Sequence, residues 1–106
     1  MNTNIKTFEV ASAAGTLSAR QLGTFTHYIK GEQFRFVVTE LPGELPVLTH
    51  RISRMRVCRI TLTELAASRH NVVDAAKIAL QKLIQNKGAD RIHDVLRNAE
   101  KTKEPA

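Results

Sequence analysis

The sequence predicts a small α+β domain, in which an antiparallel sheet of three or four strands carries two C-terminal helices packed on one face. Apolar and polar residues alternate through the first part of the chain, as in half-buried strands, and apolar residues recur at helical spacing in the last part. Proline and glycine separate the strand-like segments. The length of 106 residues fits one domain, which we expect over residues 1–100, with a frayed charged tail over residues 101–106.

The N-terminal part predicts two strands and a tight hairpin. Residues 5–11 alternate between apolar and polar, and residues 25–29 form the next strand. The small, polar residues 12–24 between them indicate a loop or a single helical turn. In Lys30-Gly31-Glu32, glycine tolerates the positive φ of a hairpin turn, so the chain should fold back there.

The strand after this hairpin has the clearest alternation in the chain. Phe34, Phe36 and Val38 share one face and are expected in the core, while Arg35 lies on the other face. Prolines and a glycine within residues 41–47 end the pattern, because proline cannot donate a hydrogen bond to a neighbouring strand. A surface loop is therefore expected at 41–47.

A second β region is expected from residue 47 to residue 65. Its later half alternates well, with Cys58 on the apolar face. The same register would bury Arg54 and Arg56, and two unpaired guanidinium groups are very unfavourable in a protein interior. The register must therefore shift near residues 53–55, through a bulge or a turn.

Residues 61–70 allow two interpretations. Thr61 and Thr63 favour a continuing strand, with an interruption at His70-Asn71 before a helix begins. The sequence Thr61-Leu62-Thr63-Glu64 also matches a capping box, which would start a helix at residue 62 and extend it to residue 85. We favour the strand.

The last part of the chain predicts two amphipathic helices. Asn71 is a suitable N-cap, and apolar residues recur at helical spacing from Val72 to Ile84. Gly88 supplies a C-terminal stop. A second helix is expected from about residue 89 to residue 100.

The net charge of +6 is concentrated in the second half of the chain. Residues 1–50 hold four basic and four acidic residues, whereas the remainder holds twelve basic and six acidic residues. Such asymmetry indicates attraction to a polyanion. The basic residues are densest between residues 51 and 59, where no acidic residue occurs. The four arginines there are Arg51, Arg54, Arg56 and Arg59.

These four arginines are the first candidates for a binding surface. The planar guanidinium group donates two parallel hydrogen bonds to phosphate or carboxylate, so the partner is expected to be DNA, RNA or an acidic protein. Charge that protects an edge strand from aggregation would account for the same residues without a ligand, as would pairing with glutamates Glu9, Glu32 and Glu40.

Three further residues extend the candidate surface. Arg69 and His70 precede the predicted helix start, where free backbone N–H groups can hold an anion, and Lys77 lies on that helix. A solvated loop followed by an Asn71 cap also explains Arg69 and His70 without a ligand.

The hairpin, strand and helix over residues 25–85 resemble part of the double-stranded RNA-binding domain, a family in which three strands precede a helix rich in Ala, Lys and Leu. The matching helix contains Asp74-Ala75-Ala76-Lys77-Ile78-Ala79-Leu80-Gln81-Lys82-Leu83. The resemblance implies binding of duplex RNA. The chain departs from the family at residues 72–74, which replace the lysine cluster of the helix start, and it shows no counterpart of the family's first RNA-contacting helix.

No motif indicates catalysis, a cofactor or a metal, and we expect no enzyme activity. Carboxylates are scattered, no glycine-rich phosphate loop or nucleophile elbow is present, and the four histidines lack metal-ligand spacing. Cys58 is expected to be a buried thiol, and a lone cysteine fits a reducing cytoplasm. The chain has neither an apolar leader nor a run of roughly 18–20 apolar residues, so we expect no membrane contact.

Two functional hypotheses follow. The first is a small basic accessory protein that binds nucleic acid with little sequence specificity through the arginine-rich surface. The second is a protein-interaction module, such as an inhibitor or adaptor of the kind common on phages and plasmids, that uses this surface against an acidic protein. A homodimer, formed through an exposed strand edge or the last helix, is compatible with both.

Overall fold

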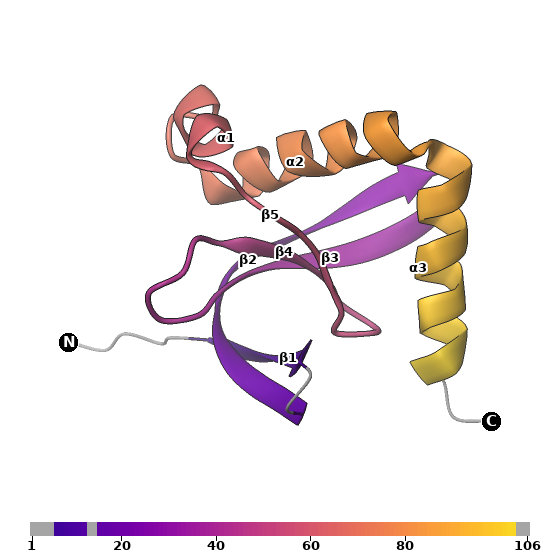
Figure 1. Ribbon diagram of the computed structural model, residues 1–106, viewed down its shortest axis with the longest axis horizontal. Helices are drawn as coiled ribbons and strands as arrows, with labels where there is room; N and C mark the ends of the chain where they lie inside the picture. The colour runs from indigo at the N-terminus through magenta and orange to yellow at the C-terminus, as the bar shows by residue number, and fades with distance from the viewer. Residues whose placement is uncertain (1–5, 13–14, 104–106) are drawn as a thin grey trace.

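The computed structural model describes residues 6–12 and 15–103, which form a five-stranded antiparallel sheet and three helices (Figure 1). Each strand pairs with the next one along the chain, so the sheet is a meander with the order β1-β2-β3-β4-β5. The strands are β1 Thr7–Ser12, β2 Gly15–Ile29, β3 Glu32–Glu40, β4 Val47–His50 and β5 Arg56–Arg59.

The helices follow the sheet and are α1 Leu62–Ala67, α2 Val72–Lys87 and α3 Ala89–Lys103. The backbone N–H of Asp74 donates to Asn71 Oδ1 at 3.0 Å, so Asn71 caps α2 as predicted. Gly88, with a φ of 91°, separates α2 from α3. At this point the chain turns, and α3 leads steeply away from the end of α2 (Figure 1).

The bend in β2 gives the sheet its curl. The first part of this long strand pairs with β1 and the later part with β3, and the register with β3 shifts between Gln21 and Gly23. Such a bulge bends a strand and increases its twist. The curl brings β1 to the segment that precedes β5, where the Ala11 N–H donates to the Arg54 carbonyl oxygen at 2.9 Å. The two edges of the sheet therefore meet on this side.

The main core lies between the helices and one face of the sheet. Phe36 of β3 and Leu48 of β4 are fully buried there, and Phe25 stacks on Phe36 with ring centres 5.4 Å apart. α2 crosses this face (Figure 1). The buried residues of this core are Ile29, Phe34, Phe36, Val38, Leu48, Ile60, Ala75, Ala76, Ala79, Leu80, Ile92 and Leu96.

A second, smaller core lies inside the curl, on the opposite face of the sheet. Val10 of β1 and Val37 of β3 are each 1% exposed. The hydroxyl groups of Thr39 and Thr49 are hydrogen-bonded to each other at 3.0 Å, which satisfies two polar groups in this interior. Because β1 pairs only with the first part of β2, the same face is exposed toward the β2–β3 hairpin, where Tyr28 is 64% exposed.

The structure confirms the α+β class and the order of strands followed by helices, but corrects the number of elements. The sheet has five strands rather than three or four, and three helices rather than two follow it. Residues 15–24 belong to β2 rather than to a loop, because pairing with β1 and β3 stabilises a stretch whose own composition does not favour a strand.

Residues 62–67 form α1, so the predicted strand to residue 65 is wrong. The capping box explains this result: the Glu64 N–H donates to Thr61 Oγ1 at 3.2 Å, and the Thr61 N–H donates to Glu64 Oε1 at 2.9 Å. A continuous helix over residues 62–85 is not observed either, because α1 ends at Ala67. The expected register shift is a turn over residues 51–55.

The predicted charged tail overlaps the last residues of α3, which runs to Lys103, and residues 104–106 lie outside the described residues.

In the part of the chain that the structure describes, no helix is long and apolar enough to cross a membrane.

Candidate nucleic-acid interface

The four arginines between residues 51 and 59 do not form one surface. Arg51 and Arg54 lie in the turn after β4, whereas Arg56 and Arg59 are the first and last residues of β5. Their side chains have different neighbours, and these neighbours determine which of the four are free to bind a ligand.

Arg54 links the turn to β1. Its guanidinium carbon lies 5.2 Å from the centre of the Phe8 ring, a cation–π distance. Its Nη1 donates to the Glu9 carbonyl oxygen at 3.4 Å and lies 3.9 Å from the Glu9 carboxylate. The guanidinium plane of Arg54 faces Phe8, and its charge lies beside Glu9. Since both partners belong to β1, Arg54 connects the two edges of the curled sheet.

Arg56 and Arg59 border the loop between β3 and β4. With Gly43, Glu44 and Leu45 they line a hollow of about 340 Å³. Arg56 Nη1 lies 3.9 Å from Glu44 Oε1, so part of the positive charge of this hollow is compensated. Arg59 is exposed at the end of β5.

Arg51 belongs to a different surface, together with Arg35. Thr26 of β2 pairs with Arg35 of β3, and the Arg51 N–H donates to the Arg35 carbonyl oxygen at 3.0 Å. Both arginines line one hollow of about 260 Å³. By the alternation of β2 and β3, the exposed residues on this side are Thr24, Thr26, Tyr28, Gln33, Arg35 and Arg51, which we call the open face.

The charges of the open face are not compensated. Among the described residues, neither Arg35 nor Arg51 forms an ion pair with a carboxylate. Like charges at neighbouring cross-strand positions repel each other. Alternation within β3 predicts that Arg35 lies on the face away from Phe34 and Phe36. The position of Arg51 beside it depends on the pairing of β3 with β4, which is a non-local feature.

The other predicted site residues lie on the helical side of the molecule. Arg69 and His70 are exposed in the connection between α1 and α2, with left-handed φ angles of 56° and 63°. Lys77 Nζ lies 5.8 Å from the centre of the Phe25 ring, on the side of the main core. The structure therefore does not place these three residues on the open face.

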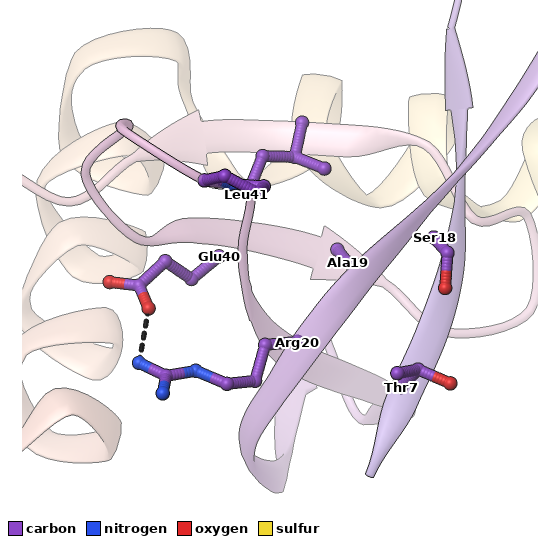
Figure 2. A pocket seen from close by; sticks show the side chains of 7 residues that line it. Thr7, Ser18, Ala19, Arg20, Glu40 and Leu41 are labelled. Atoms are coloured by element: carbon purple, nitrogen blue, oxygen red, sulfur yellow. Dashed lines mark hydrogen bonds and ion pairs between the residues drawn. The ribbon is translucent and has the colours of Figure 1, made fainter. Parts of the chain in front are cut away.

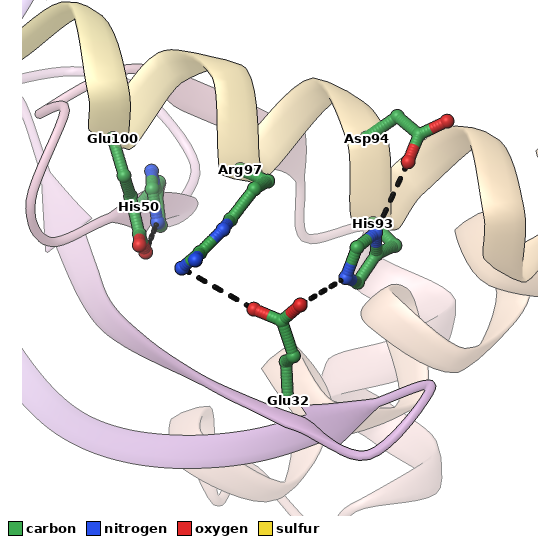
Figure 3. Close-up of polar contacts among 6 residues, drawn as sticks. All are labelled: Glu32, His50, His93, Asp94, Arg97 and Glu100. Atoms are coloured by element: carbon green, nitrogen blue, oxygen red, sulfur yellow. Dashed lines mark hydrogen bonds and ion pairs between the residues drawn. The ribbon is translucent and has the colours of Figure 1, made fainter.

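A serine, a histidine and a glutamate meet in the interior. His50 is fully buried; its Nδ1 lies 2.7 Å from Ser53 Oγ and its Nε2 lies 2.8 Å from Glu100 Oε2 (Figure 3). These residue types recur in acyl-transfer enzymes. Here the imidazole is inaccessible to a substrate, and Ser53 Oγ also accepts the Met55 N–H at 3.2 Å. The group therefore joins α3 to the turn after β4.

A second polar group joins α3 to the β2–β3 hairpin. His93 Nε2 lies 2.8 Å from Glu32 Oε1 and its Nδ1 lies 3.1 Å from Asp94 Oδ1, while Arg97 Nη1 lies 3.3 Å from Glu32 Oε2 (Figure 3). Hydrogen bonds that His93 donates to the carboxylates of Asp94 and Glu32 raise the pKa of His93 above its usual value. The hydrogen bond from His93 lowers the pKa of Glu32.

A further hollow of about 360 Å³ lies between β1, β2 and the loop after β3 (Figure 2). Arg20 and Glu40 form an ion pair at its wall. The other lining residues are uncharged: Thr7, Ser18, Ala19, Leu41 and Pro42. Because its two charges compensate each other, this hollow lacks the positive potential of the open face.

Cys58 is unsuited to nucleophilic chemistry. Burial disfavours the thiolate and raises the pKa of Cys58 to about 11, so the thiol stays protonated at neutral pH. The described residues contain no group of three or more His, Cys, Asp or Glu side chains that could hold a metal ion.

Comparison with protein-family models, curated proteins and solved structures found no match for this chain. The partial resemblance to the double-stranded RNA-binding domain is therefore unsupported by a family match. The fold departs from it as well, since the sheet has five strands and no helix precedes it in the described residues.

Proposed function

We propose that this protein binds nucleic acid through the open face, with little preference for sequence. The observation that carries the proposal is that Arg35 of β3 and Arg51 of the turn after β4 lie side by side, without a compensating carboxylate among the described residues. A phosphate group between the two guanidinium groups would relieve their repulsion and accept charge-assisted hydrogen bonds from both.

Tyr28 favours a single-stranded ligand. Its side chain is 64% exposed and lies on the same face as Arg35, at a diagonal cross-strand position. Such diagonal positions lie about 7–8 Å apart, within reach of an aromatic ring and an arginine that contact one nucleotide strand. An unpaired base stacks on an exposed ring whatever its identity, which gives affinity with little sequence preference.

The rest of the open face is polar and uncharged. Thr24, Thr26 and Gln33 present short hydrogen-bonding groups that can contact sugar and phosphate oxygens. The net charge of +6 adds a long-range attraction that brings a polyanion to the protein. In this proposal Arg56, Arg59 and Arg69 contribute to that general field rather than to the contact.

The test is a fluorescence-anisotropy titration with labelled single-stranded DNA, single-stranded RNA, duplex DNA and duplex RNA, at low and moderate salt. We expect tightest binding to single strands and weaker binding as salt increases. An Arg35→Gln/Arg51→Gln variant should lose about tenfold or more in affinity, because two charge-assisted contacts are removed. A Tyr28→Ala variant should lose affinity for single strands and not for duplexes.

An Arg59→Gln/Arg69→Gln variant is the matched control, because it removes the same charge from exposed positions outside the open face. It should keep nearly the full affinity. Equal losses in the two double variants would mean that net charge alone attracts the probe. Absence of binding to all four probes at low salt would reject the proposal, provided that circular dichroism shows folded protein.

A further inference from the structure

A groove of about 300 Å³ lies where the end of α2 and the adjoining part of α3 meet the sheet beside β5. Its floor is aliphatic and is formed in part by Val57, Leu83 and Val95. Val95 of α3 is 46% exposed at this groove. Apolar surface is therefore accessible at a place bounded by three elements of the fold.

The border of this groove is basic. Arg56, Lys87 and Arg91 line it, and its lining contains no carboxylate. Among the described residues, Lys87 and Arg91 form no ion pair, and the nearest partner of Arg56 is Glu44 at 3.9 Å. Three cations around an aliphatic floor are complementary to a ligand that has both aliphatic groups and carboxylates.

The edge of β5 borders the groove. Met55, Arg56 and Val57 are consecutive and all line it. Successive side chains of a strand point to opposite faces, so contact with both Arg56 and Val57 of β5 identifies the edge of the strand rather than one face. β5 is the last strand of the sheet and is paired only with β4, and β1 bonds to the chain before β5, at Arg54. An edge strand beside a groove is the arrangement by which proteins bind an extended peptide.

We propose that this groove binds an extended, acidic segment of a partner protein. The backbone of the segment lies beside β5, its aliphatic side chains enter the groove, and its carboxylates pair with Arg56, Lys87 and Arg91. Nucleic acid fits this site less well than the open face, because none of the described residues that line the groove is aromatic and could stack on a base. The proposal does not depend on nucleic-acid binding by the open face.

A short fluorescein-labelled peptide of alternating leucine and glutamate is a suitable probe, titrated against the full chain at low salt. A second peptide with lysine in place of glutamate serves as the charge-reversed probe. We expect the glutamate peptide to bind and the lysine peptide not to bind. A Lys87→Glu/Arg91→Glu variant should lose about tenfold or more in affinity for the first peptide and gain affinity for the second.

Two further variants locate the site. Val95→Asp places a carboxylate on the groove floor at a partly exposed position and should abolish binding of the glutamate peptide. Arg59→Glu reverses one charge on β5 outside the groove lining and should leave binding nearly unchanged. Arg35→Gln/Arg51→Gln should also leave it unchanged, so failure of the nucleic-acid proposal and failure of this one are distinguishable.

Three results would overturn the proposal. The first is no binding of the glutamate peptide at low salt by folded protein. The second is binding that is insensitive to Val95→Asp and to the charge reversal at residues 87 and 91. The third is concentration-dependent self-association in sedimentation that Val95→Asp abolishes, because the groove would then be occupied by a second copy of this chain.

Discussion

The helices α2 and α3 pack on the same sheet by different means. α2 presents small residues, of which Ala75, Ala76 and Ala79 are buried, and it approaches β2 very closely. A Cβ atom added at Gly23 would lie 2.5 Å from Val73 Cγ2. The contact between α2 and the sheet is therefore a close apolar one, in which shape determines the fit.

α3 buries Ile92 and Leu96 but is held as well by polar contacts at both of its ends. His50 pairs with Glu100 near the end of the helix, and His93 pairs with Glu32 nearer its start (Figure 3). Phe34 lies between the two imidazoles, with ring centres 6.2 Å from His50 and 5.7 Å from His93. α2 therefore depends on steric complementarity, whereas α3 depends also on the hydrogen bonds of two histidines.

The largest effect is expected from Glu100→Ala. The substitution leaves Nε2 of the fully buried His50 without its hydrogen-bond partner, and an unsatisfied buried polar group costs about 3 kcal/mol at the upper end of the usual range. Urea denaturation measures the loss. Native-state hydrogen exchange should show faster exchange in α3 than in α2, because the contact that is lost belongs to α3.

Glu100→Gln is the control for this prediction, because its amide oxygen or nitrogen can still bond to the imidazole. It should lose clearly less stability than Glu100→Ala. Equal losses in the two variants would show that packing of the side chain, rather than its hydrogen bond, holds the end of α3. An equal increase of amide hydrogen exchange in α2 and α3 would contradict the distinction between the helices.

A smaller effect is expected from Gly23→Ala, which tests the close contact of α2. The added methyl group overlaps Val73, and overpacking of this kind costs about 1–3 kcal/mol. Val73→Ala in the same chain should restore part of the lost stability, since it removes the atom that the new methyl group meets. A double-mutant cycle by urea denaturation measures the coupling. Additive losses would indicate that the strand bulge at Gly23, rather than the helix contact, is sensitive.

The features that the sequence predicted correctly are local. Alternation placed Phe34 and Phe36 in the core, and Asn71 and Gly88 marked the two ends of α2. The capping box at Thr61 is equally visible in the sequence and competes with the β propensity of Thr61 and Thr63. Its reciprocal hydrogen bonds prevail in the fold and start α1.

The features that could not be predicted from the sequence depend on contacts between residues that are far apart along the chain. The alignment of Arg35 with Arg51 follows from the register between β3 and β4, and His50 reaches Glu100 over fifty positions of sequence. The arginine-rich segment is predicted as one surface because its four arginines are close in sequence, and the expected register shift does not say where each side chain is sent. A turn over residues 51–55 instead sends Arg54 to β1 and leaves Arg51 beside Arg35.

The smallest effect is expected at His93, and it should depend on pH. Hydrogen bonds that His93 donates to Asp94 and Glu32 raise the pKa of His93, so its charged form is favoured in the folded protein. This contribution to stability is fully present below the ordinary histidine pKa of about 6.5 and is lost as pH rises through the higher pKa of the folded state. The pKa of Glu32 is lowered, chiefly by its hydrogen bond with His93, so its contribution is lost only in more acidic solution.

Urea denaturation of the natural chain and of His93→Gln, at about pH 5.5 and about pH 8.5, measures this difference. We expect His93→Gln to be less stable than the natural chain at the lower pH, with the gap narrowing at the higher pH. His70→Gln is the control, because His70 is exposed between α1 and α2 and forms no ion pair among the described residues. A gap that is the same at both pH values would show that His93 holds α3 by packing against Phe34 rather than by its charge, which would make α3 more similar to α2 than the polar contacts suggest.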